Sequence, residues 1–120
     1  MRRDPIEDAR RAGLRVDIAP LGTWAPAALV AEYDRAERTI RVSATAVARI
    51  HTLWGEEEAR SFLRAAVAHE LYHHVACRSH GRSTHAAECE RRAHRFARLR
   101  YGADPWRFER MLRSMAPNVH

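Results

Sequence analysis

Residues 56–76 constrain this chain more than any other segment, because they combine a strong helical period with two histidines four residues apart. Gly55 interrupts the chain before them, and three consecutive glutamates fill the first turn, where the helix dipole favours negative charge. One face of the expected helix follows three- and four-residue steps through Phe62, Ala66, His69, His73 and Ala76. We therefore expect a helix over Glu56–Ala76 that presents two imidazoles on a mostly apolar face.

The same segment contains the pattern H-E-x-x-H, formed by His69, Glu70 and His73. Residues four apart lie on one face of a helix, so both imidazoles can bind one metal ion. Glu70 projects at a different angle and can take a proton from a water on that ion, which is the arrangement of a zinc hydrolase. The alternative is a pair of hydrogen-bonded core histidines. We favour the metal, because two buried imidazoles need polar partners.

A hydrolytic zinc site needs a third protein ligand and an open position for water. The metzincin pattern would place a histidine where this chain has Ser79, so that solution fails. A second helix, expected over residues 84–101, offers Glu88 and Glu90 instead. Glu90 begins a helical face that continues through Ala93, His94, Ala97 and Tyr101. Glu88 falls to one side of that face, so we expect Glu90 to be the ligand and Glu88 to be a solvated surface residue.

These residues resemble the ImmA/IrrE-type minimal gluzincin metallopeptidases, in which H-E-x-x-H is followed by E-x-x-A-[N/D]-x-F-A. Glu90, Ala93, Phe96 and Ala97 match the second pattern, and the resemblance covers residues 14–101. It implies a zincin-like fold, a zinc ion held by the two histidines and Glu90, and endopeptidase activity. It also implies a substrate lying along a sheet edge near residues 29–33, and a protein target such as a transcriptional regulator.

One position departs from the family pattern. Four residues after Glu90, where the family usually has Asp or Asn to orient a zinc-bound histidine, this chain has His94. A histidine can also accept a hydrogen bond, but it orients the ligand less strongly and could itself bind metal. The substitution leaves open whether the site turns over.

The chain has two cysteines, Cys77 and Cys89, which are too few for a disulfide framework. Cys77 lies four residues after His73, so a closed structural site of His69, His73, Cys77 and Glu90 is an alternative to the catalytic one. We favour the catalytic site, since buried cysteine is more often a small hydrophobic residue. No apolar signal segment follows the N-terminus, and no stretch approaches the ~20 apolar residues of a membrane span. We expect a cytoplasmic protein with reduced cysteines and no membrane partner.

The charge of the chain allows two interpretations. The formal net charge is +6, and all 21 basic residues are arginines, many of them between residues 91 and 113. Such a pair of helices could bind nucleic acid, or it could present a solvated arginine face. We favour the second interpretation, because acidic residues are interspersed and no nucleic-acid-binding motif is present. A protein or peptide substrate is the expected partner, nucleic acid stays a less favoured one, and the sequence gives no oligomeric state.

Residues that typically begin or end helices and strands predict the remaining elements. Asp4 and Pro5 begin a helix that Gly13 ends, and Ser43 begins another, whose face contains Val47, Ile50 and Trp54. Short strands are expected over residues 16–18, 29–34 and 39–43, the last two as a hairpin, and a final helix over residues 106–115. A chain of 120 residues indicates one domain, residues 1–120. The expected class is α+β, with a small antiparallel-rich sheet packed on helices.

Together these features predict a zinc-dependent endopeptidase. Glu70 would act as the general base and then pass the proton to the leaving amine. The donor to the oxyanion stays undecided among Tyr101, His94, His80 and His85. The rival function is a non-catalytic, zinc-containing regulatory or nucleic-acid-binding module. It is disfavoured because a structural site does not need Glu70.

Overall fold

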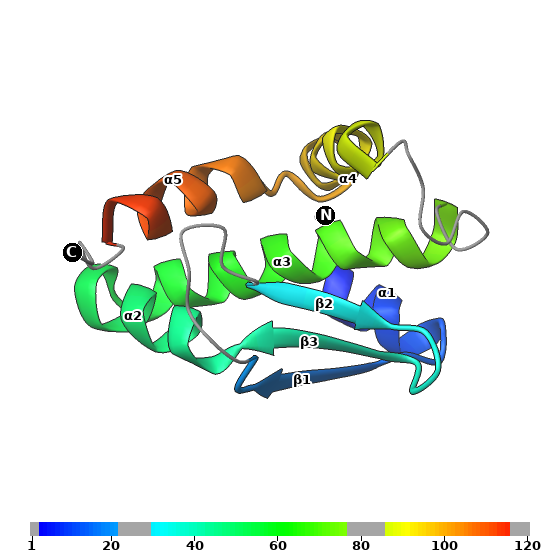
Figure 1. The fold of residues 1–120 in the computed structure, drawn as a ribbon, viewed down its shortest axis with the longest axis horizontal. Helices are drawn as coiled ribbons and strands as arrows, with labels where there is room; N and C mark the ends of the chain where they lie inside the picture. Colours follow the sequence, from blue (N-terminus) through cyan, green and yellow to red (C-terminus); the bar gives the residue numbers. More distant parts are fainter. Residues whose placement is uncertain (1–2, 22–29, 77–85, 116–120) are drawn as a thin grey trace.

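The fold places one long helix between a small sheet and a second layer of helices (Figure 1). The computed structural model describes residues 3–21, 30–76 and 86–115. Within these ranges the elements are α1 (Pro5–Arg11), β1 (Arg15–Ala19), β2 (Ala31–Asp34), β3 (Thr39–Ser43), α2 (Ala44–Trp54), α3 (Glu56–Ala76), α4 (Ala86–Tyr101) and α5 (Pro105–Met115). The expected α+β class is confirmed, and none of the described helices is long and apolar enough to cross a membrane.

The sheet is mixed rather than antiparallel-rich, which corrects the sequence-based expectation. Its strand order is β1-β3-β2. β2 pairs with β3 antiparallel as the predicted hairpin, whereas β1 pairs with β3 parallel, with Arg15 opposite Thr39. The two outer strands run in opposite directions, so the strand between them can be antiparallel to only one of them. This order leaves β2 as an edge strand on the side of the sheet nearest the site.

Helix α3 has the predicted bounds and forms the centre of the core. Its buried apolar side chains are Ala59, Phe62, Ala65, Ala66, Val67, Ala68 and Leu71. The many alanines allow close approach of neighbouring elements, and α3 packs against both the sheet and helices α1, α2, α4 and α5. Figure 1 shows the sheet on one side of α3 and the layer of α4 and α5 on the other. The helix that carries the H-E-x-x-H residues is therefore held from several directions.

The caps form as the sequence predicts. The Asp4 carboxylate accepts a hydrogen bond from the Ile6 N–H at 2.9 Å, and the Ser43 hydroxyl accepts one from the Ala46 N–H at 3.2 Å. On the predicted face of α2, Ile50 is fully buried, whereas Trp54 is 42% exposed. Trp54 is the last residue of α2, where the chain turns through Gly55 at a φ of 101°.

Helix α4 is anchored at its end by the first helix of the chain. The Tyr101 hydroxyl donates a hydrogen bond to the Asp8 carboxylate at 2.7 Å, and Tyr101 is buried. Gly102 follows with a φ of 67°, as expected for a residue that ends a helix. Helix α5 starts at Pro105, one residue before its predicted start, and buries Phe108 and Leu112. The predicted starts of the second strand at residue 29 and of the second ligand helix at residue 84 lie outside the described residues.

Candidate metal centre

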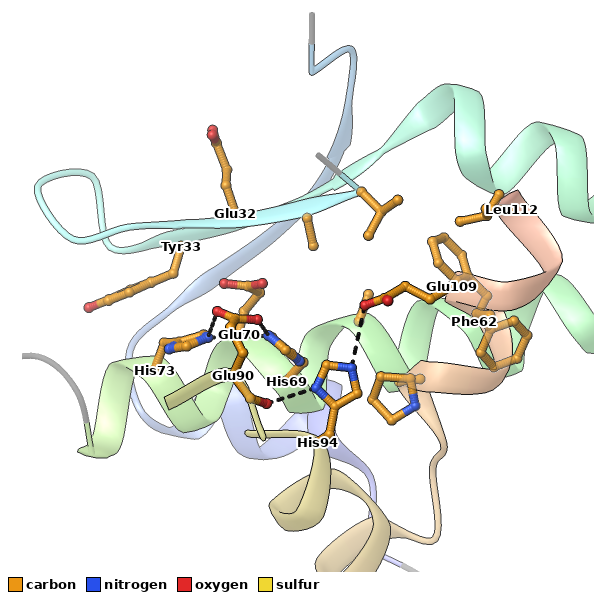
Figure 2. Close-up of a pocket in the computed structure, with 16 residues that line it drawn as sticks. Glu32, Tyr33, Phe62, His69, Glu70, His73, Glu90, His94, Glu109 and Leu112 are labelled. Carbon is orange, nitrogen blue, oxygen red and sulfur yellow. Dashed lines mark hydrogen bonds and ion pairs between the residues drawn. The ribbon is translucent and has the colours of Figure 1, made fainter. Parts of the chain in front are cut away.

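Side chains from α3 and α4 converge at one point (Figure 2). His69 Nε2 lies 2.8 Å from Glu90 Oε1, and His73 Nε2 lies 3.0 Å from Glu90 Oε2. The two Nε2 atoms are 3.2 Å apart. The structure thus brings together the three residues predicted as metal ligands, with two contributed by one helix and the third by the next.

The ionisation of these groups is coupled. Hydrogen bonds from His69 and then His73 hold the pKa of the Glu90 carboxyl far below its usual range. Burial lowers the pKa of His73, but the hydrogen bond to Glu90 and the charges of Glu70 and Glu90 outweigh it, so the net pKa is raised. In the absence of metal, Glu90 therefore stays ionised between the two rings.

Glu70 lies beside this cluster and is almost completely buried. Only 9% of the residue is exposed, and it lines the same cavity as His69 and His73. Burial raises the pKa of the Glu70 carboxyl, and the positive charge of His69 and His73 only partly offsets that effect. A buried carboxylate with a raised pKa, beside two imidazoles, is a candidate to accept and release a proton.

His94 does not take the orienting role that the family pattern assigns to its position. Its Nδ1 lies 2.8 Å from the backbone carbonyl of Glu90, one turn back on the same helix. Its ring stacks on Trp106 at 4.5 Å and meets the His69 ring edge-on at 4.6 Å. Burial, followed by the charge of His69, lowers the pKa of His94 despite the hydrogen bond to Glu90 and the charge of Glu109. Ligand-type atoms of His69, Glu90 and His94 all lie within 4.8 Å of one another.

A cavity of about 470 Å³ opens beside these residues and has a polar and an apolar end. Its polar lining consists of Glu32, Tyr33, His69, Glu70, His73, Glu90, His94 and Glu109. Its apolar lining consists of Val30, Ala31, Phe62, Ala65, Ala66, Pro105, Phe108 and Leu112. Val30 directly precedes the edge strand β2 and residues 31–33 belong to it, so this strand forms one wall of the cavity. The Tyr33 hydroxyl and His74 Nδ1, 2.6 Å apart, share a hydrogen bond at this wall.

The other residues considered from the sequence lie elsewhere. Glu88 forms an ion pair with Arg92 at 2.7 Å and does not join the histidines, in agreement with a surface role. Tyr101 is excluded as an oxyanion donor in this arrangement, because it donates to Asp8 and does not line the cavity. His80 and His85 lie outside the described residues.

The cysteines differ from expectation in one respect. Cys89 is disulfide-bonded, so the prediction of reduced cysteines is wrong for this residue. The other cysteine of the sequence, Cys77, lies outside the described residues, as does its alternative role as a ligand. A count of two cysteines argues against a network of disulfides, but it does not exclude a single bond near two packed helices.

The sequence alone did not indicate two residues of the site, Trp106 and Glu109. Trp106 and Glu109 reach His94 only because α5 docks beside α4. The one available signal was that Glu109 directly follows Phe108, which faces the core, so its carboxylate had to emerge at the edge of that face. Tyr33 lies in the range 29–33, where the family resemblance placed the substrate, but the sequence did not indicate its hydrogen bond with His74.

A scan of the chain against protein-family models found no match, and searches of curated proteins and of solved structures found none either. The resemblance to the ImmA/IrrE-type gluzincins therefore stays a prediction that depends on the residues of the two motifs.

Proposed function

We propose that this protein is a zinc-dependent endopeptidase with a zincin-like domain, similar to the ImmA/IrrE-type gluzincins. The observation that carries the proposal is the convergence of His69, His73 and Glu90 beside the buried Glu70. Two imidazoles and one carboxylate, contributed by consecutive helices, form the donor set that catalytic zinc uses in gluzincins. The intact Glu70 favours catalysis over a purely structural ion.

The donor atoms fit a metal ion better than they fit hydrogen bonds alone. If both Nε2 atoms carried hydrogens, two N–H groups would face each other across 3.2 Å. Tetrahedral ligands about 2.0–2.2 Å from a single zinc ion are separated by roughly 3.3–3.6 Å. The three contacts of 2.8, 3.0 and 3.2 Å are somewhat shorter, so the ligands would have to move apart only slightly to hold an ion. A single cation could be coordinated at once by the lone pairs of both Nε2 atoms and of the Glu90 carboxylate.

In the proposed reaction each residue has one task. His69, His73 and Glu90 would hold the ion. When bound, zinc supplies a Lewis acid that polarises a peptide carbonyl and makes water nucleophilic at neutral pH. Glu70 accepts the proton of the attacking water on its carboxylate and delivers it to the leaving nitrogen. Its burial keeps that carboxylate away from bulk water while it holds the proton.

The edge strand supports a peptide substrate. Among the described strands, β2 pairs only with β3, so the backbone of residues 31–34 can pair with an extended peptide on its other side. The adjoining apolar end of the cavity can accept one apolar side chain of that peptide. The resemblance extends the proposal to a transcriptional regulator as substrate. The cytoplasmic location expected from the sequence belongs to the same proposal. The disulfide-bonded Cys89 argues against that location, because thiols there are kept reduced.

The decisive experiment compares the wild type with Glu70→Gln in a proteome-derived peptide library, each protein loaded with zinc. The amide is nearly isosteric and leaves all three ligands in place. We expect unchanged zinc content and a loss of about 10²–10⁴ in cleavage rate. Glu57→Gln, which alters an exposed glutamate on the same helix, is the matched control and should cleave normally. Equal cleavage by wild type and Glu70→Gln would exclude Glu70 as the base.

The rival proposal is a zinc-containing module that does not cleave peptides. His94 favours it, because this residue bonds to the backbone of Glu90 and contacts the His69 ring without accepting a hydrogen bond from it. Three results together would support this module: the wild type binds zinc, it cleaves no peptide, and it captures a protein partner only when zinc is bound. DNA binding that weakens steeply with salt, and that is the same in wild type and Glu70→Gln, would instead support a nucleic-acid-binding function.

A further inference from the structure

The cavity contains a second group of ligand-type atoms that the proposed zinc site does not use. It consists of His94 from α4 and Glu109 from α5 (Figure 2). His94 Nδ1 faces the backbone carbonyl of Glu90 at 2.8 Å. A carbonyl can only accept, so the hydrogen of this ring sits on Nδ1. In the neutral ring, the other nitrogen, Nε2, is then left with a lone pair.

That nitrogen has no hydrogen-bond partner in the described part of the protein. His94 is 3% exposed, and its Nε2 is fully buried. The group opposite is Glu109 Oε2, at 3.5 Å. A buried nitrogen lone pair that faces a carboxylate oxygen is unfavourable unless a positive charge lies between them. The two atoms thus form an acceptor pair without a donor.

The spacing of this pair matches two ligands of one ion. A separation of 3.5 Å is longer than the ~2.7–2.9 Å of a charge-assisted hydrogen bond. It lies within the roughly 3.3–3.6 Å that separates two tetrahedral ligands of the same zinc ion. The pair is therefore too open for a direct hydrogen bond and suitably placed to bind a cation.

The imidazole is also held in a fixed orientation. Trp106 stacks on one face at 24° between ring planes, and the His69 ring stands against it at 88°. With Nδ1 bonded as well, the ring cannot turn Nε2 away from Glu109. Figure 2 shows the Glu109 carboxylate above His94, and both residues line the cavity that holds Glu70 and Glu90. Water or substrate can therefore complete the coordination of an ion at this position.

We propose that His94 Nε2 and Glu109 Oε2 bind a second divalent cation beside the site formed by His69, His73 and Glu90. One imidazole and one carboxylate suit zinc and other first-row divalent ions. With two protein ligands instead of three, the second ion binds more weakly than the first. Adjacent paired ions are a recurrent arrangement in hydrolases. The inference goes beyond the proposed peptidase activity, because the second ion binds whether or not the first one is catalytic.

The test measures metal stoichiometry in protein first stripped with a chelator. Zn²⁺, and separately Co²⁺, is titrated into wild type, Glu109→Gln and Glu88→Gln by calorimetry, with elemental analysis after equilibrium dialysis. We expect two equivalents in the wild type, one tight and one weaker. Glu109→Gln should keep the tight equivalent, and its affinity for the second ion should fall by ~100-fold or more. Even residues that only support a metal ligand change metal affinity 10–100-fold. Glu88→Gln alters a glutamate paired with Arg92 and should keep both equivalents.

A second variant guards against indirect effects. His94→Phe keeps an aromatic ring against Trp106 but removes Nε2, so it too should lose only the weaker equivalent. A single equivalent in the wild type would overturn the second site. So would two equivalents in Glu109→Gln. Loss of the tight equivalent in Glu109→Gln, with the weaker one kept, would move Glu109 into the first site and also overturn the proposal.

Discussion

The two halves of helix α3 are both buried, but they are buried in different ways. In the first half, Phe62 is 2% exposed and packs edge-on against Phe108 of α5. In the second half, His69 and Glu70 are 8% and 9% exposed and carry polar atoms that need partners. The apolar contacts of the first half need no bound partner. Burial of the second half is favourable only when its polar atoms have hydrogen-bond partners or a bound ion. We therefore expect the stability of the second half, unlike that of the first, to depend on the proposed metal ion.

The largest expected effect comes from the apolar half. Phe62→Ala removes a buried aromatic ring and should lower the free energy of unfolding by about 3–5 kcal/mol. Because no polar partner is involved, the loss should be equal in zinc-free and zinc-loaded protein. Urea unfolding monitored by circular dichroism measures both. If the loss of stability in Phe62→Ala depended strongly on zinc, the two halves of α3 would not be stabilised independently, as we propose.

The next effect concerns the polar half and its dependence on zinc. At free zinc one hundred times the dissociation constant, the wild type should gain about 2.7 kcal/mol of stability. Glu90→Ala removes the residue that contacts both histidines and should abolish the gain. Glu88→Ala should retain it, since Glu88 pairs with Arg92 on the surface. Thermal unfolding across a zinc series gives the comparison, and an intact gain in Glu90→Ala would move the third ligand elsewhere.

The smallest effect is a pH dependence in zinc-free protein. Burial raises the pKa of Glu70 in the folded state, so the folded protein holds this proton more tightly than the unfolded chain does. The resulting stability is present below the ordinary glutamate pKa of about 4.3 and is lost as the pH rises through the raised value. Glu70→Gln carries no such proton. Its stability relative to wild type should therefore increase from pH 4 to pH 7, reaching about 1–3 kcal/mol.

The control for this measurement is Glu57→Gln on the exposed side of the same helix, whose difference from wild type should stay flat with pH. A flat difference for Glu70→Gln as well would mean that the buried carboxylate is solvated or bonded in the folded state.

The sequence predicted features that depend on local periodicity and punctuation. The bounds of α3, the caps at Asp4 and Ser43, and the face that brings Glu90 to the histidines all follow from residues a few positions apart. Helical spacing fixes such relations before any tertiary contact forms.

Features that depend on how elements dock were not predictable in the same way. Strand order, and hence the parallel pairing of β1, depends on where the chain crosses the sheet. The surroundings of His94 depend on α5, which begins eleven residues after it and contributes Trp106 and Glu109. No short sequence pattern predicts that contact. The burial of Phe108 and Leu112 fixes the orientation of α5, and the position of Glu109 results from that orientation.

The hydrogen bond from Tyr101 to Asp8 joins residues 93 positions apart, so it closes almost the whole chain into one loop. Closing a loop of that length carries an entropic cost that other contacts must offset. Helix α4 holds Glu90 and His94, yet its far end is fixed by the first helix of the chain. A protein shortened by that helix would keep every side chain of the metal centre and still hold α4 less firmly. The position of Glu90 and His94 therefore depends in part on α1, although no residue of that helix lines the cavity of the candidate metal centre.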